Sequence, residues 1–201
     1  GENPIDNPSA ADNFVTGVNP ESSRNEEIFY ANLLDGRPSG PPGGKQITTT
    51  TPAAVGDPVN VLDLGRRMSR DGRYIAFDSY ADFPATVDPI NQTGTSTFAL
   101  YLYDINGGTF RRIGPRSTDD AEAAGGDQQH YPGFTDYDAA GPQTLLLQTR
   151  QNIKADGTVP TTESEGLNPI DNRPTQIYSY DLTSAATGFT RLTQFPISAF
   201  F

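Results

Sequence analysis

The chain contains no cysteine and no tryptophan, and only one histidine and one methionine among its 201 residues. Without cysteine, a disulfide framework, a thiolate metal site and a cysteine nucleophile are all excluded. No apolar run reaches the about 20 residues that a membrane-spanning helix requires, and no basic start followed by an apolar stretch marks a signal peptide. The chain begins Gly-Glu-Asn rather than with Met, which suggests that an upstream segment was removed or is not included in this sequence.

Positive charge is also scarce. Lys and Arg number 14 against 25 Asp and Glu, so the net charge is −11 at pH 7. Such a field repels nucleic-acid phosphates and anionic lipid surfaces, and we expect no nucleic-acid partner and no direct membrane insertion. The abundant residues are turn formers, with 20 Gly and 17 Pro, which favour short strands and long loops.

The most informative stretch runs from Arg67 to Tyr80. Its Asp71-Gly72 dipeptide is typical of a tight turn, and the β-branched and aromatic residues that follow, 74–77, predict a strand leaving that turn. A second apolar run, 144–148, follows a degraded copy of the same turn. Both runs are apolar at successive positions, which predicts strands covered on both faces.

A pair of strands joined by a turn recurs three times. The predicted pairs are 28–31 with 45–48, 100–105 with 110–113, and 177–182 with 189–193. In the last two pairs the first strand carries tyrosines two residues apart, which places them on one face of a pleated strand.

The elements recur in a fixed order: a Ser-x-Asp-Gly turn, an inner strand, a loop, a Tyr-Asp strand and an Arg-Leu-Thr strand. This order resembles the repeat of TolB-like, WD40-like β-propellers. The resemblance is good across residues 66–196, approximately, and partial across residues 19–48. The resemblance implies an all-β fold of propeller blades, with short antiparallel strands and long loops. We expect a polar N-terminal loop segment over 1–27 and a repeat domain over 28–201. The repeat domain comprises a partial blade 28–48, blades 66–114 and 132–194, and the start of a further blade at 195–201.

Such a ring is incomplete, because propellers close with about four to eight blades and we expect about two to three here. A repeat unit cannot bury its faces alone. We therefore expect the remaining blades of the same polypeptide, or other protein chains, to cover the open faces. A sandwich-like stack of the repeats is the alternative.

Three loops that precede the first strand of each pair share an Asx-Pro pattern: 19–21, 88–91 and 168–171. Clusters of Asp, Asn and carbonyl oxygens are what calcium requires. None of the loops has the Asp-rich run of an EF-hand, however, and Asx-Pro is an ordinary turn opener. We therefore predict no metal site and no cofactor, with calcium left open.

No catalytic residue is predicted either. Asp127 could orient His130 as a general base, but no Gly-x-Ser-x-Gly elbow supplies a nucleophile, and we interpret His130 as a packing residue under a loop. We interpret the acidic run 119–122 as solvated loop, because adjacent carboxylates rarely flank one bond at the about 5–9.5 Å that glycoside hydrolysis needs. The arginine clusters at 66–73 and 111–116 could bind an acidic partner, but more simply offset nearby Asp and Glu.

These features predict a non-enzymatic propeller scaffold for protein–protein contacts in a larger assembly. The family resemblance implies an extracytoplasmic location, periplasmic or secreted. Two alternatives stay open. One is the propeller part of a prolyl-oligopeptidase-type serine peptidase, and the other is a module that binds a glycan or another ligand through exposed tyrosines at 101, 103, 178 and 180.

Overall fold

The computed structural model describes residues 27–31, 33–34, 37–38, 44–52, 59–61, 67–83, 99–116, 130–135, 144–169, 173–184 and 188–196. Two four-stranded antiparallel sheets dominate them. The first contains β5 (Asn60–Val61), β6 (Tyr74–Ser79), β7 (Ala99–Asp104) and β8 (Thr109–Arg112). The second contains β9 (His130–Phe134), β10 (Thr144–Thr149), β11 (Gln176–Asp181) and β12 (Phe189–Arg191).

Shorter strands precede these sheets. β1 (Phe29–Ala31) pairs with β4 (Gly44–Gln46), and between them β2 (Leu33–Leu34) pairs with β3 (Arg37–Pro38). In the described part of the chain the one helix is a 3-10 turn, η4 (Glu163–Glu165), so no helix there is long and apolar enough to cross a membrane. The all-β prediction is confirmed.

The turn before β6 is held by its own side chains. The Ser69 hydroxyl donates to Asp71 Oδ1 at 2.6 Å and accepts from the Tyr74 amide at 2.9 Å, while Asp71 Oδ1 also accepts from the Arg73 amide at 3.0 Å. Gly72 has a φ of 72°, which glycine adopts without steric cost. The Ser-x-Asp-Gly sequence therefore closes the turn and starts the strand.

The two four-stranded sheets are built alike. Each is a meander, with its strands paired in chain order. Phe77 lies opposite Tyr101 in the first sheet, and Leu147 lies opposite Tyr178 in the second. The strands predicted within 74–77, 100–105, 110–113, 144–148, 177–182 and 189–193 are confirmed, but β5 and β9 were not foreseen. The first strands of the two sheets begin at residues 60 and 130.

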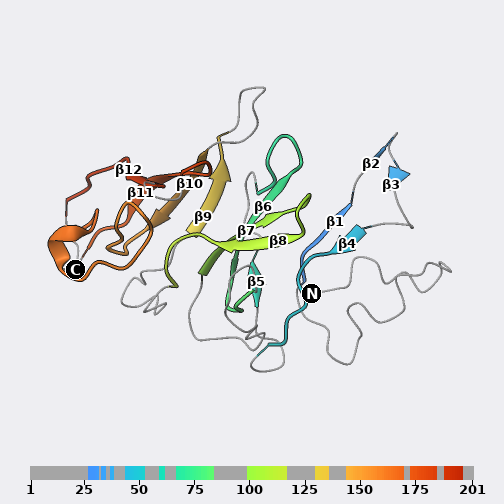
Figure 1. Ribbon diagram of the computed structural model, residues 1–201, viewed down its shortest axis with the longest axis horizontal. Helices are drawn as coiled ribbons and strands as arrows, with labels where there is room; N and C mark the ends of the chain where they lie inside the picture. The colour runs from blue at the N-terminus through green and yellow to red at the C-terminus, as the bar shows by residue number, and fades with distance from the viewer. Residues whose placement is uncertain are drawn as a thin grey trace.

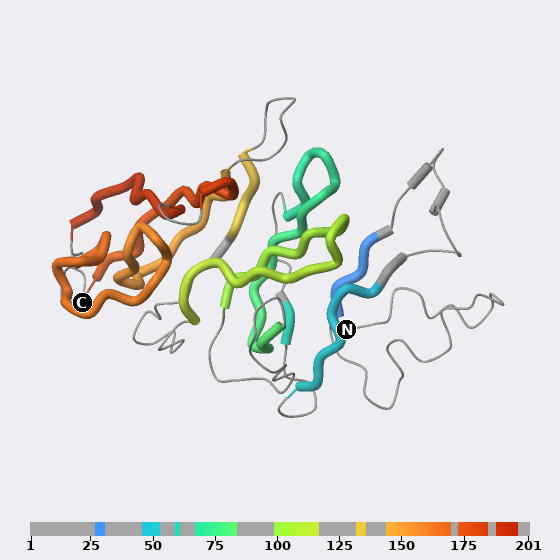
Figure 2. Tube along the Cα trace, in the orientation of Figure 1, coloured from blue at the N-terminus to red at the C-terminus, as the bar shows by residue number. Residues whose placement is uncertain are grey.

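The β1/β4 hairpin and the two sheets follow one another in chain order along the longest axis (Figures 1 and 2). One cluster of buried side chains joins the hairpin to β5–β8, and it includes Ile28, Ile47, Val59, Ile75, Phe77, Tyr101 and Tyr103. A second cluster joins β5–β8 to β9–β12, and it includes Ala76, Leu100, Leu102, Ile113, Leu145, Leu147, Tyr178, Tyr180 and Phe189. The middle sheet is therefore buried on both faces.

We call the face that a sheet turns toward the next sheet in chain order its forward face. In β6 every residue after Tyr74 is buried, as predicted. In β10 burial alternates: Leu145 and Leu147 are buried, whereas Leu146, on the forward face, is only partly buried. Within the described residues only the other face of β10 has a neighbouring sheet, so cover on both faces is confirmed for β6 and stays a prediction for β10.

Candidate functional site

The long connections leave from one edge of the stack. β6 and β8 end at this edge and β7 begins there, and the next sheet repeats the arrangement. The connections that start here are 47–59, 80–98, 113–129 and 150–175, whereas a short turn, 105–108, joins β7 to β8 at the opposite edge. We call this side the long-loop edge. It is the candidate binding surface, because loops carried by a rigid framework commonly hold function.

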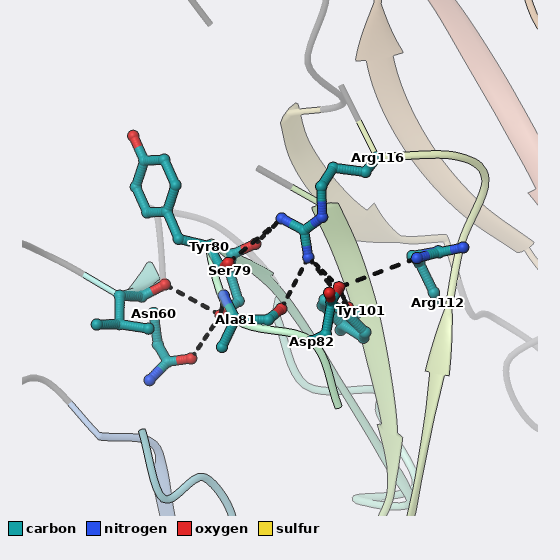
Figure 3. A network of polar contacts seen from close by, with 9 residues as sticks. Asn60, Ser79, Tyr80, Ala81, Asp82, Tyr101, Arg112 and Arg116 are labelled. Carbon is teal, nitrogen blue, oxygen red and sulfur yellow. Dashed lines mark hydrogen bonds and ion pairs between the residues drawn. The ribbon is translucent and has the colours of Figure 1, made fainter. Parts of the chain in front are cut away.

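Arg116 anchors the segment that follows β6 at this edge (Figure 3). Its guanidinium group donates to the carbonyl oxygens of three consecutive residues, Ser79 at 3.5 Å, Tyr80 at 3.4 Å and Ala81 at 3.0 Å. It also forms an ion pair with Asp82. Since the Arg116 side chain is only 17% exposed, water screens this pair less than it screens a surface ion pair.

Two further side chains reach the same carboxylate. The Tyr101 hydroxyl donates to Asp82 Oδ1 at 3.1 Å, and Arg112 Nη1 lies 3.9 Å from that oxygen. Burial is the main cause that raises the pKa of Tyr101 to about 12, so its hydroxyl keeps its proton and stays a donor at neutral pH. The cluster therefore fixes the start of the connection from β6 to β7.

The next sheet joins this cluster through Gln151. Its Nε2 donates to the carbonyl oxygen of Arg116 at 3.0 Å, although 35 residues separate the two. The backbone around Gln151 repeats that around Ala81: Thr149 Oγ1 accepts from the Gln151 amide at 3.0 Å, as Ser79 Oγ accepts from the Ala81 amide at 3.0 Å. The turn after β10 is thus equivalent to the turn after β6, and in the second sheet it contacts the neighbouring sheet through Gln151.

A second network links the β1/β4 hairpin to the middle sheet. Glu27 accepts from the Thr48 hydroxyl at 2.5 Å, from the Thr50 amide at 2.6 Å and from the Thr50 hydroxyl at 3.0 Å. Asn60 of β5 donates to Thr50 Oγ1 at 2.9 Å and accepts from the Ser79 hydroxyl at 2.8 Å. An amide from the following sheet therefore completes a network that the hairpin begins.

The last sheet carries the same network without such an amide among the described residues. Thr193 Oγ1 donates to Gln176 Oε1 at 2.8 Å and accepts from the Ile177 amide at 2.8 Å. The Phe195 amide donates to Gln176 Oε1 at 3.0 Å, and Gln176 Nε2 donates back to the Phe195 carbonyl oxygen at 3.0 Å. Gln176 thus takes the place of Glu27.

The connection from β10 to β11 folds back over the free edge of β12. The carbonyl oxygen of Ala155 accepts from the Phe189 amide at 2.8 Å, which covers a backbone donor on an edge strand. Gly157, at a φ of 82°, lies so close to Phe189 that an added Cβ would sit 2.9 Å from the ring. The loop therefore protects the sheet against edge-to-edge pairing.

Asn168, one of the calcium candidates, closes the base of this loop. Its side chain is buried, and its Nδ2 donates to the carbonyl oxygens of Arg150 at 3.2 Å and Pro174 at 3.1 Å. Nearby, Arg173 pairs with Glu163 and is the main cause that lowers the pKa of that carboxyl. These contacts give Asn168 a role in shaping the loop. The described residues hold no group of three or more His, Asp or Glu side chains placed to bind a metal.

Several other candidates lie outside the described residues: the calcium loops at 19–21 and 88–91, Asp127 and the acidic run 119–122. His130 begins β9, opposite Gln148 of β10. Arg73 of the first arginine cluster pairs with Asp104 at 2.9 Å, and Arg67 donates to the carbonyl oxygen of Pro132. Partners within the chain therefore engage members of the predicted basic clusters.

The four tyrosines of the ligand-binding alternative are buried. Their exposed fractions are 2% for Tyr101, 3% for Tyr103, 0% for Tyr178 and 8% for Tyr180. They lie between sheets, so they offer no surface on which a sugar ring could stack.

Sequence reasoning missed the polar residues that join the sheets. The signal was a pair of repeated dipeptides: Glu27-Ile28 corresponds to Gln176-Ile177, and Ile47-Thr48 corresponds to Leu192-Thr193. Arg116 and Gln151 lack such a signal, because they act between segments that are distant in sequence.

Comparisons of the chain with protein-family models, curated proteins and solved structures found no match.

Proposed function

We propose that this chain is part of a β-propeller that acts as a non-enzymatic, rigid scaffold for protein–protein contacts within a larger extracytoplasmic assembly. The proposal rests on one observation: like sheets are stacked in chain order, and the middle one is buried on both faces. Four-stranded meanders that pack face to face in sequence are the building units of propellers.

The cross-sheet contacts support the scaffold role. The Glu27 network and the bond from Gln151 to Arg116 fix neighbouring sheets to each other at the long-loop edge. Loops that begin and end on such a frame present side chains at reproducible positions, and less conformational entropy is lost when a partner binds. We therefore assign the partner contacts to the long-loop edge.

Site-specific cross-linking tests this assignment. A photo-reactive amino acid is introduced singly at Thr49 or Thr51, exposed at the long-loop edge, and at Asn106 or Thr183, exposed at the opposite edge as matched controls. The variants are expressed in the natural host, and adducts are identified by mass spectrometry. We expect one protein species to be captured from the first pair and not from the second.

Equal capture from both edges, or capture from neither, would contradict the assignment. A hydrolase domain captured at the long-loop edge, or present in the same polypeptide, would favour the peptidase alternative instead.

A further inference from the structure

The forward face of β9–β12 is open among the described residues and carries three apolar side chains beside the polar Gln148, Ser179 and Thr190. Ile177 is 40% exposed, Leu192 is 54% exposed and Leu146 of the neighbouring strand is partly buried. This sheet lies at one end of the row (Figure 1). Adjacent apolar side chains on one sheet face are a feature of interaction surfaces.

The same positions are covered wherever another sheet follows. The Ile47 amide donates to the carbonyl oxygen of Ile28, the Ile113 amide to that of Leu100, and the Leu192 amide to that of Ile177, each at 2.8 Å. These three pairs are therefore equivalent. The exposed fractions are 8% and 3% in the first pair and 0% and 0% in the second. Only the pair at the end of the row is exposed.

Two polar side chains, Gln176 and Thr193, form a hydrogen-bonded network beside these apolar residues. In the first copy, Asn60 of the following sheet donates to Thr50 Oγ1 at 2.9 Å and lies 3.3 Å from Glu27 Oε2. In the last copy, Gln176 and Thr193 make the equivalent bonds within their own sheet. At this first junction the following sheet is thus bound by apolar packing and by one amide side chain.

We propose that the forward face of β9–β12 binds a further four-stranded sheet of the same repeat. This sheet presents an aromatic face like that of Phe77 and Tyr101 to Ile177 and Leu192, and an amide equivalent to Asn60 to the Gln176 network. The inference rests on the sheet stacking that the proposed function also uses.

The further sheet belongs to the same polypeptide and follows β12. At both existing junctions, the sheet that covers a forward face is the next one along the chain. The connections 47–59 and 113–129 both leave the last strand of one sheet and reach the first strand of the next. Continuity with these two interfaces favours the same polypeptide over a second copy.

Hydroxyl-radical footprinting of the protein purified from its natural host tests the proposal, together with the denatured mass of the polypeptide. Ile113 is the buried reference at an equivalent position, and Val159, 64% exposed on a loop, is the exposed reference. We expect the reactivity of Leu192 to fall to the level of Ile113 at every dilution, in a polypeptide heavier than 21.6 kDa.

Two outcomes would overturn the proposal. If Leu192 reacts as fast as Val159, the face is open. If protection is lost on dilution and the polypeptide has a mass of 21.6 kDa, the occupant is a second copy. The two tests fail independently. If Leu192 is open but Thr49 gives specific adducts, the further sheet is refuted and the partner role of the long-loop edge stands. If Leu192 is protected but Thr49 gives no adducts, the partner role is refuted and the further sheet stands.

A charge variant adds an independent readout. Leu192→Asp should abolish the protection of Ile177, whereas Val159→Asp, the matched exposed control, should leave that protection unchanged. Unchanged protection in a folded Leu192→Asp protein would also overturn the proposal.

Discussion

The clearest energetic prediction compares two equivalent residues that differ in burial. Ile113 and Leu192 each donate their amide to the neighbouring strand at 2.8 Å, but Ile113 is 0% exposed and Leu192 is 54% exposed. Truncating a fully buried Ile to Ala costs about 2–5 kcal/mol, because transfer free energy is lost and a cavity forms. Full burial of a Leu side chain contributes about 1.5–3 kcal/mol, so Leu192→Ala, with just under half of its surface covered, should cost about 1 kcal/mol.

Urea unfolding of the 201-residue chain, followed by circular dichroism, measures both costs. We expect the midpoint of Ile113→Ala to fall well below that of the wild type and that of Leu192→Ala to fall only slightly, with unchanged slopes. Equal losses in the two variants would show that Leu192 is covered in this chain and would refute the assignment of an open end. A negligible loss for Ile113→Ala would show that the two sheets do not share a core.

Three further predictions follow from single groups. Thr48→Val should lower the free energy of unfolding by about 1–3 kcal/mol, because the buried Ile28 amide and the Glu27 carboxylate both lose the hydroxyl that they share. The equivalent variant Thr193→Val should cost about 1 kcal/mol or less in the same urea assay, because water can replace the hydroxyl there. Burial raises the pKa of Tyr178 to about 12, so the unfolded chain loses this proton first and stability should fall as the pH rises above 10.0, less steeply in Tyr178→Phe. The hydrogen bond from Arg73 lowers the pKa of Asp104 below 3.8, so the stability advantage of the wild type over Asp104→Asn should be present at neutral pH and shrink as acid protonates the carboxylate.

The strands that could be predicted from the sequence are those with a strong local pattern. β6 follows a turn that its own Ser69 and Asp71 close, and β7 and β11 alternate large residues at the period of a pleated strand. β5 covers only Asn60–Val61, and β9 contains Pro132 and Gly133, which are depleted in strands. Pairing with β6 and β10, rather than local preference, makes these two segments extended.

The polar junctions were less predictable than the strands, because their partners are far apart in the chain. Glu27 and Asn60 meet only once the hairpin packs on the middle sheet, and the contact between Gln151 and Arg116 needs both four-stranded sheets in place. The repeated dipeptides identify equivalent positions but not the residue that the next sheet adds. Composition likewise indicates nothing about which tyrosines are buried.

The asymmetry of the two faces of each sheet gives the stack a direction. The forward face of the middle sheet is mainly aliphatic, as at Leu100, Leu102 and Ile113, whereas the face of the last sheet that packs on it carries aromatic residues, as at Tyr178 and Tyr180. An aliphatic face that packs on an aromatic one buries large rings and leaves few voids. Two forward faces placed together would pack aliphatic side chains on aliphatic ones and would supply no amide equivalent to Asn60 to the polar network. Growth of the stack in chain order is therefore favoured over self-association of its open end.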